Sequence, residues 1–215
     1  MGKKIGIIVF PGSNCDQDSV NAINSLGAKA EKVWHKDTLP EDLDGIIVPG
    51  GFSYGDYLRC GAMAANSPIA GQIKSFSESG KPVLGICNGF QVLTELRILP
   101  GALLLNNGRK FICREEPLVF HAKESNKKTE MVFPIAHGEG RFHIDQAGLD
   151  SLKANDQIAF SYSDNPNGSV SDIAGIRNKA GNVLGLMPHP ERATEDFHES
   201  QDGRNFLKQF FSLEA

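Results

Sequence analysis

Residues 83–91 read Val-Leu-Gly-Ile-Cys-Asn-Gly-Phe-Gln, an apolar run that leads into Cys87 with a glycine two positions before it and another two positions after it. Apolar residues at helical spacing follow at Val92, Leu93 and Leu96. This pattern is typical of a nucleophile elbow, a sharp strand-to-helix turn with room only for small residues beside the nucleophile. Such a turn exposes the sulfur at the carboxyl edge of a sheet and places a helix N-terminus under it, which favours the thiolate. By itself the pattern also fits a buried core cysteine.

Short apolar runs alternate with amphipathic stretches through the first hundred residues. The runs predict buried strands of a parallel sheet, and they span residues 5–10, 30–34, 45–48 and 82–87. Residues 16–26 and 69–79 predict helices, because their apolar side chains recur three or four positions apart. This order predicts an α/β fold with an open, mostly parallel central sheet and helices on both faces.

The pattern becomes β-like after residue 96. Strands are predicted at residues 111–114, 118–122 and 131–135, with a polar hairpin loop at 123–129 between the last two. A second hairpin is predicted from residues 175–178 and 182–187, and a final amphipathic helix from 201–213. The sequence shows no repeat or linker, so we expect one domain over residues 1–215.

Composition excludes several classes of function. The 215 residues are 40% hydrophobic and 22% charged, with a formal net charge of −4, which gives no electrostatic footprint for nucleic acid or an anionic membrane. No apolar run approaches the ~20 residues of a membrane span. The basic start and six-residue apolar run at 5–10 fit a first strand better than a signal peptide, so we expect a cytoplasmic protein with reduced thiols. The absence of C-x-x-C and H-E-x-x-H motifs predicts no metal site.

A thiol nucleophile needs a base, and His189-Pro190-Glu191 is the best candidate. The flanking prolines favour extended backbone, in which residues two apart project to the same side, so Glu191 can orient the imidazole of His189. For an isolated motif of this kind a solvent-facing turn is the favoured interpretation, and the presence of Cys87 in the same domain shifts the preference to the functional one. His35 and His198 have no such context and are expected at the surface.

The Pro49-Gly50-Gly51 turn after residues 45–48 predicts an oxyanion site. Acyl transfer needs backbone N–H donors where the carbonyl oxygen becomes negative, and the amides of Gly51 and Asn88 are the candidates. Ligands of open α/β sheets bind beyond the carboxyl ends of the strands, where both turns are expected. Without Cys87, Gly50-Gly51 would be interpreted as a tight turn only.

Together these segments resemble the class I (triad) glutamine amidotransferases. Four further stretches resemble one branch of that family, the glutaminase subunits of phosphoribosylformylglycinamidine synthases, and they span residues 11–16, 51–59, 136–140 and 167–175. The resemblance covers essentially the whole chain and implies a flavodoxin-like amidotransferase fold with β-hairpin additions.

The resemblance also implies the chemistry. Cys87 would attack the side-chain amide of glutamine, His189 would protonate the departing ammonia, and Glu191 would hold His189, while Gln91 and Gly51 would contact glutamine. Ammonia would pass to an ATP-dependent synthetase subunit of a complex that also has a small third subunit. ATP and Mg are expected at that synthetase and no cofactor in this chain, which agrees with the absence of a G-x-x-x-x-G-K-[ST] loop.

The sequence leaves the roles of four residues and three alternative functions undecided. Ser13, Asn14, Cys15 and His137 are candidates for shaping the site or docking a partner, and Cys15 could equally be a structural thiol. The alternatives for the whole chain are an amidotransferase subunit serving GMP or carbamoyl phosphate synthesis, a flavodoxin-like cysteine hydrolase, and a non-catalytic regulator of a synthetase.

Overall fold

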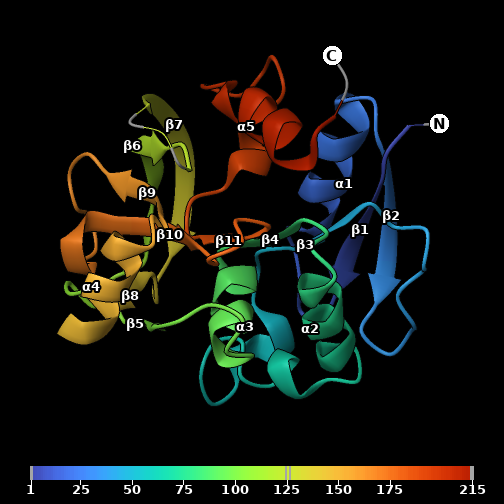
Figure 1. Ribbon diagram of the computed structural model, residues 1–215, viewed down its shortest axis with the longest axis horizontal. Coiled ribbons are helices and arrows are strands. Elements are labelled where there is room, and N and C mark those ends of the chain that lie inside the picture. The colour runs from blue at the N-terminus through green and yellow to red at the C-terminus, as the bar shows by residue number, and fades with distance from the viewer. Residues whose placement is uncertain (1, 124, 126, 214–215) are drawn as a thin grey trace.

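A nine-stranded sheet runs through the centre of the computed structural model, in the order β2-β1-β3-β4-β11-β10-β9-β6-β7 (Figure 1). The structure describes residues 2–123, 125 and 127–213. The nine strands are β1 (Lys4–Val9), β2 (Lys29–Trp34), β3 (Gly45–Val48), β4 (Val83–Ile86), β6 (Ile112–His121), β7 (Lys128–His137), β9 (Ile158–Tyr162), β10 (Ile173–Arg177) and β11 (Val183–Leu186). A separate two-stranded sheet pairs β5 (Ala102–Leu104) with β8 (Arg141–His143).

The first half of the sheet is parallel, as the alternation of strands and helices predicts. Strands β2, β1, β3, β4 and β11 all run in one direction. Helices α1 (Asp16–Ser25) and α5 (Asp202–Phe211) cover one face, while α2 (Ala70–Glu78) and α3 (Asn88–Glu95) cover the other (Figure 1). The inner strands β1, β3, β4 and β11 are therefore buried on both faces, which explains the continuous apolar runs in their sequences, whereas the edge strand β2 buries only Val33. The predicted fold class is confirmed.

The second half of the sheet is antiparallel and contains the predicted hairpins. Strands β10 and β11 form the hairpin expected around residues 179–181. Strand β6 is continuous where two strands were predicted at 111–114 and 118–122, because Pro117 stays in the strand, opposite Val132, and its carbonyl accepts from Ser163 N. Residues 124 and 126 of the predicted loop lie outside the described residues. No element is predicted for residues 141–162, where β8, α4 (Gln146–Ala154) and β9 lie.

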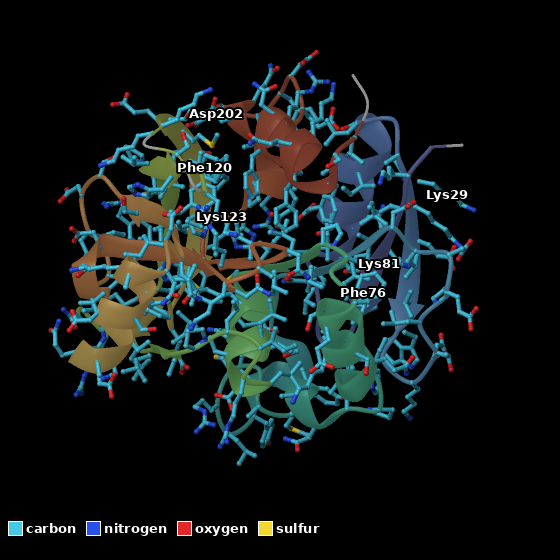
Figure 2. All side chains as sticks on the ribbon, viewed as in Figure 1. Lys29, Phe76, Lys81, Phe120, Lys123 and Asp202 are labelled. Carbon is cyan, nitrogen blue, oxygen red and sulfur yellow. The ribbon has the colours of Figure 1, made fainter. Side chains whose placement is uncertain are left out.

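Side chains tie the outer elements to the sheet (Figure 2). The Asp202 carboxylate accepts a hydrogen bond of 2.8 Å from Val132 N and so fixes the start of α5 against β7. Lys81 Nζ lies 5.2 Å from the centroid of the Phe76 ring, a cation–π contact between the end of α2 and the turn into β4. Within the described residues, none of the helices has the length and apolar character of a membrane span.

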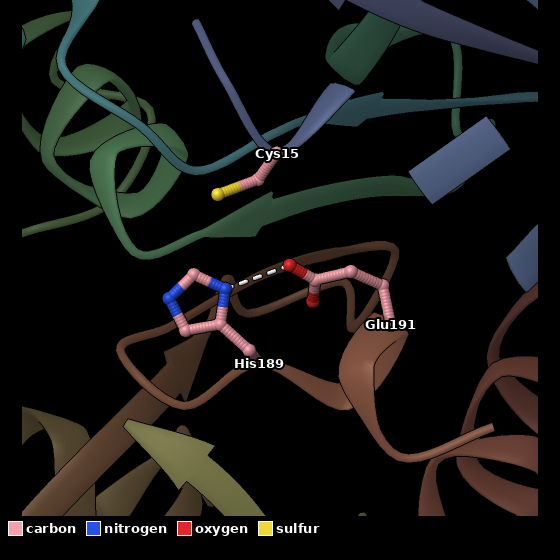
Figure 3. A group of neighbouring side chains, drawn as sticks. All are labelled: Cys15, His189 and Glu191. Carbon is pink, nitrogen blue, oxygen red and sulfur yellow. Dashed lines mark hydrogen bonds and ion pairs between the residues drawn. The ribbon is translucent and has the colours of Figure 1, made fainter. Parts of the chain in front are cut away.

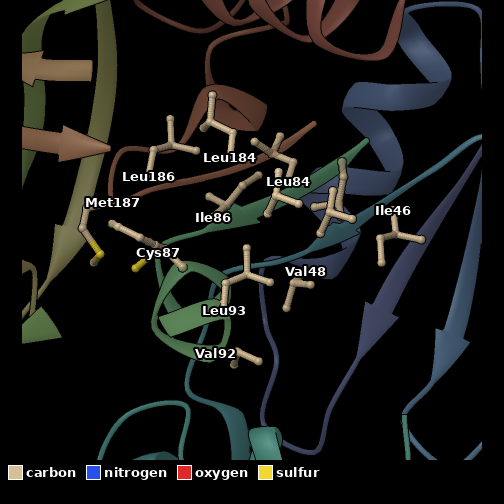
Figure 4. Close-up of a cluster of buried hydrophobic side chains, with 14 of the residues drawn as sticks. Ile46, Val48, Leu84, Ile86, Cys87, Val92, Leu93, Leu184, Leu186 and Met187 are labelled. Carbon is tan, nitrogen blue, oxygen red and sulfur yellow. The ribbon is translucent and has the colours of Figure 1, made fainter. Parts of the chain in front are cut away.

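The pairing of β4 with β11 sets the position of the candidate site. Ile86 lies opposite Leu186, and Cys87 N donates to Leu186 O at 2.8 Å, so two segments about a hundred residues apart leave the sheet side by side. Apolar side chains of both strands and of α3 fill the space behind Cys87 (Figure 4). Because β1, β3, β4 and β11 are parallel, the segments that follow them meet at one edge of the sheet.

Candidate active site

Cys87 lies in the strained turn that its sequence predicts. Its backbone angles are φ 49° and ψ −105°, in a region that L-residues rarely adopt, and it is the N-cap of α3. A Cβ at Gly89 would lie 1.8 Å from Val48 O, and one at Gly85 would lie 2.8 Å from Gly89 O. Backbone atoms occupy both positions, so the two glycines are sterically required and the turn is a nucleophile elbow.

His189 and Glu191 form a buried pair at the end of β11 (Figure 3). The imidazole Nδ1 and the carboxylate Oε1 are 2.7 Å apart, and the two residues are only 1% and 2% exposed. Pro190 starts a short 3₁₀ turn, Pro190–Arg192, and His189 N donates to Pro134 O on β7. The structure therefore supports the predicted orientation of Glu191 toward His189 and excludes the solvent-facing turn.

The structure brings Cys87 and His189 to the same point beside Gly50. A Cβ on Gly50 would lie 2.8 Å from His189 Cε1, 3.2 Å from Cys15 Sγ and 3.4 Å from Cys87 Cβ. His189 Nε2 is buried and has no hydrogen-bond partner among the described residues, so the nitrogen on the side away from Glu191 remains available. Cys87 itself is 6% exposed.

The surroundings of His189 favour its protonated form. Burial lowers the pKa of this imidazole, but the charge of Glu191 and the adjoining side chains of Cys15, Cys87 and Glu191 outweigh that effect, so the pKa lies well above its ordinary value. Neither thiol makes a well-oriented hydrogen bond to the ring. An imidazolium held in this way can donate a proton to a leaving group beside Cys87.

The predicted oxyanion turn lies next to the elbow. Gly51 has φ 125°, a conformation that glycine tolerates, and a Cβ there would lie 2.6 Å from Asn14 N and 3.1 Å from Ser13 Cα. Ser13 and Gly51 also form an isolated antiparallel bridge. Ser13 and Asn14 therefore lie against the Gly51 turn. Of the two roles considered for them from sequence, this position fits shaping the site.

Asn88 and Gln91 are joined in a buried hydrogen-bond network on the first turn of α3. Asn88 Nδ2 donates to Gln91 Oε1 at 2.9 Å, and Gln91 Nε2 donates to Glu139 O at 2.8 Å. Ser53 N donates to Asn88 Oδ1, which links the segment after Gly51 to the residue after Cys87. The side chain of Gln91 is thus at the site, with its amide engaged by protein groups.

His137 lies on the β7 side of the site, close enough to His189 for their charges to interact. Its Nδ1 contacts Asn106 Oδ1 at 3.2 Å, and its Nε2 is buried without a partner in the described part of the chain. Burial lowers the pKa of His137 to about 4, so this imidazole is neutral near pH 7. Asn106 also accepts from Gly140 N, which fixes the 137–140 turn that presents the Glu139 carbonyl to Gln91.

Other residues depart from expectation. The prediction of a surface position for His35 is wrong: it is 4% exposed, because it packs against Phe10 and its Nδ1 contacts Tyr54 Oη at 2.9 Å. His198 is half-buried and its Nδ1 accepts from two backbone amides, those of residues 194 and 195. Cys113 is exposed on β6, where it lies opposite Ala136 of β7.

Sequence reasoning missed how close Cys15 comes to the catalytic pair. Its Sγ, a ring nitrogen of His189 and a carboxylate oxygen of Glu191 lie within 4.8 Å of one another (Figure 3). Arg192 Nη2 donates to the same sulfur at 3.2 Å. The position of Arg192 directly after His189-Pro190-Glu191 was a usable signal, whereas nothing in the sequence marked Asn106.

A thiol on an elbow, an imidazole–carboxylate pair and a glycine turn at the adjoining strand end can together carry out acyl transfer through a thioester. On this sheet, they are the features of a triad glutamine amidotransferase. The chain belongs to the family of CobB/CobQ-like glutamine amidotransferase domains, whose family model matches residues 2–210.

Individual proteins of known sequence or structure are also similar to this chain. The chain is 51% identical over 207 residues to the phosphoribosylformylglycinamidine synthase subunit PurQ of Jannaschia sp. (strain CCS1), and the match covers 93% of each chain. It superposes on a chain of PurLQS from Thermotoga maritima with a TM-score of 0.90 and 42% identity, over 99% of both chains. A Thermoplasma acidophilum protein, provisionally described as part of a GMP synthase, matches at 16% identity with a TM-score of 0.68 over 99% of this chain and 94% of the other, and shows the shared fold alone.

Proposed function

We propose that this chain is the glutaminase subunit of a phosphoribosylformylglycinamidine synthase, which releases ammonia from glutamine for a separate ATP-dependent synthetase subunit. The observation that carries the proposal is the meeting of Cys87 with the His189–Glu191 pair, in a chain 51% identical to a subunit of that synthase. The synthetase would use the ammonia to convert formylglycinamide ribonucleotide to the amidine.

The first half-reaction forms a thioester. The Cys87 sulfur attacks the side-chain carbonyl carbon of glutamine, and the carbonyl oxygen becomes negative where the amides of Gly51 and Asn88 can stabilise it. The C–N bond then breaks as His189 gives its proton to the departing nitrogen. Ammonia leaves, and a γ-glutamyl thioester remains on Cys87.

The second half-reaction releases glutamate. A water molecule gives a proton to His189 and attacks the thioester carbonyl, and the C–S bond breaks to return the Cys87 sulfur. Glu191 keeps Nδ1 of His189 engaged throughout, so Nε2 faces the reacting atoms in both steps. Gln91 holds the Glu139 turn and Asn88 in place beside the substrate.

The closed state of the site supports a partner-dependent enzyme. Cys87 is 6% exposed and His189 1%, so glutamine reaches the sulfur only after the surrounding segments move. Beside the site, Tyr57 and Leu58 are 75% and 90% exposed, in a segment whose Ser53 amide is bonded to Asn88. We infer that the synthetase docks here, and that the isolated chain hydrolyses glutamine slowly. The small third subunit, and ATP and Mg at the synthetase, belong to the same proposal.

Replacing the nucleophile tests the proposal. With the synthetase present, Cys87→Ala should abolish glutamine-dependent synthesis of the amidine and leave ammonia-dependent synthesis unchanged, because only the source of nitrogen is lost. Cys113→Ser is the matched control, since it removes a thiol whose side chain is exposed on β6. If Cys87→Ala still supports glutamine-dependent synthesis, Cys87 is not the nucleophile. If a GMP synthetase can use glutamine when this chain is added, the chain serves GMP synthesis instead.

A further inference from the structure

Cys15 places a second sulfur in the catalytic cluster, beside Gly50. It follows β1 and is the N-cap of α1, and it is 4% exposed. Its Sγ lies within 4.8 Å of both a ring nitrogen of His189 and a carboxylate oxygen of Glu191 (Figure 3). The acyl-transfer steps use the His189–Glu191 pair and do not use this thiol.

One further atom of the cluster has unfilled bonding capacity. Glu191 Oε2 is buried and has no hydrogen-bond partner among the residues that the structure describes, whereas His189 Nδ1, the ring nitrogen that faces the carboxylate, contacts Glu191 Oε1 at 2.7 Å and would exchange that contact for the ion. A buried polar atom without a partner is costly, and a metal ion is one ligand that satisfies such atoms. Thiolate, imidazole and carboxylate are the three ligand types that zinc takes in proteins.

We propose that Cys15, His189 and Glu191 form a binding site for Zn²⁺, and that the bound ion inhibits glutamine hydrolysis. Tetrahedral zinc, with Zn–N about 2.0 Å and Zn–S about 2.3 Å, spaces its ligand atoms roughly 3.5 Å apart. Side-chain rotation by on the order of 1 Å therefore brings the three atoms into range of one ion. Water completes the coordination.

The charges of the cluster balance with zinc present. Binding releases two protons to solvent, one from Cys15 and one from the His189 imidazolium, so the thiolate and the Glu191 carboxylate offset the two positive charges of the ion. Arg192 donates to Cys15 Sγ at 3.2 Å, and its own charge is paired with Asp18 at 2.9 Å. A thiolate has further lone pairs, so it can keep this hydrogen bond while it binds the metal.

Inhibition follows from which groups the ion occupies. Zinc bound to His189 and Glu191 removes the imidazole that exchanges protons with the departing nitrogen and the attacking water, and separates it from its orienting carboxylate. This part of the inference rests on the proposed glutaminase function, whereas binding of the metal does not. The site is distinct from simple capture of zinc by the catalytic thiol, because it requires Cys15 and not Cys87.

Cobalt(II) is the direct probe, because tetrahedral Co²⁺ with a thiolate ligand gives visible and charge-transfer absorption. The whole chain should give this spectrum, Cys87→Ala and Cys113→Ser should keep it, and Cys15→Ser should lose it. Calorimetric Zn²⁺ affinity should fall on the order of tenfold or more in Cys15→Ser and in Glu191→Gln, since loss of a direct ligand costs at least as much as loss of a ligand's partner.

Activity gives the second readout. Zn²⁺ should inhibit glutamine hydrolysis by the complex with its synthetase, a chelator should reverse the inhibition, and Cys15→Ser should need far more zinc for the same effect. A cobalt spectrum that is absent from the wild type, unchanged in Cys15→Ser or lost in Cys87→Ala would overturn the site. Metal binding that follows the predicted pattern with no effect on hydrolysis would overturn the inhibition while leaving the site in place.

Discussion

Substituting Gly50 should disable the site without unfolding the protein. The added Cβ of Gly50→Ala would lie 2.8 Å from His189 Cε1, where ordinary contact begins at 3.4 Å, so the imidazole must move by roughly 0.6 Å. Gly50 is not among the residues with positive φ, so alanine adds a steric effect and no backbone strain. A displacement near 1 Å at reacting groups costs on the order of 10²-fold in rate, and we expect kcat/KM for glutamine to fall by about that factor.

The cost in stability should be modest. Overpacking of this size costs about 1–3 kcal/mol, within the roughly 5–15 kcal/mol that holds a typical domain folded. Gly71→Ala is the matched control, because Gly71 lies in the first turn of α2 and a Cβ there contacts nothing within 4 Å, so activity should stay at the wild-type level. Glutamate release in the presence of the synthetase and chemical denaturation of both variants provide the measurements. A Gly50→Ala protein with the wild-type kcat/KM would show that His189 is not against Gly50.

Three further predictions rest on single contacts. Gly89→Ala should destabilise the protein by more than about 3 kcal/mol in denaturation, because its Cβ would lie 1.8 Å from Val48 O, and a wild-type unfolding midpoint would contradict the elbow geometry. Glu191→Gln should lower kcat, measured with saturating glutamine, on the order of 10²–10⁴-fold, because the charge that holds His189 is lost. An unchanged kcat would show that Glu191 has no part in catalysis. Burial lowers the pKa of His137 from 6.5 to about 4, so its contribution to stability is full above pH 6.5 and is lost as the pH falls toward 4. Between pH 6.5 and about pH 5, the free energy of unfolding should therefore drop by about 2 kcal/mol more in the wild type than in His137→Gln, and equal drops would refute the shift.

The elbow could be predicted from sequence because its cause is local. Glycines two positions either side of Cys87 reflect steric limits that the structure shows directly, with Val48 O against one glycine and Gly89 O against the other. The parallel strands were predictable for a similar reason, since burial on both faces leaves continuous apolar runs. The meeting of His189 with Cys87 was predicted from the chemistry alone, and the pairing of β4 with β11 that produces it was not predicted from the sequence.

The features that could not be predicted from the sequence depend on tertiary packing. His35 carries no pattern that marks it as buried, and its place follows from Phe10 and Tyr54, which come from two other segments. Strand β6 continues through Pro117 because neighbouring strands on both sides hold it, an effect that local propensity cannot show. Likewise, Cys15 approaches His189 only because β1 and β11 end at the same edge of the sheet.

The assignment of Cys87 as nucleophile is tested most directly by covalent labelling. The protein, in complex with its synthetase, is treated with a glutamine analogue that alkylates active-site thiols, and the modified residue is located by mass spectrometry. We predict a single adduct on Cys87 that excess glutamine prevents. An adduct on Cys15, or labelling shared equally with Cys60 and Cys113, would contradict the assignment.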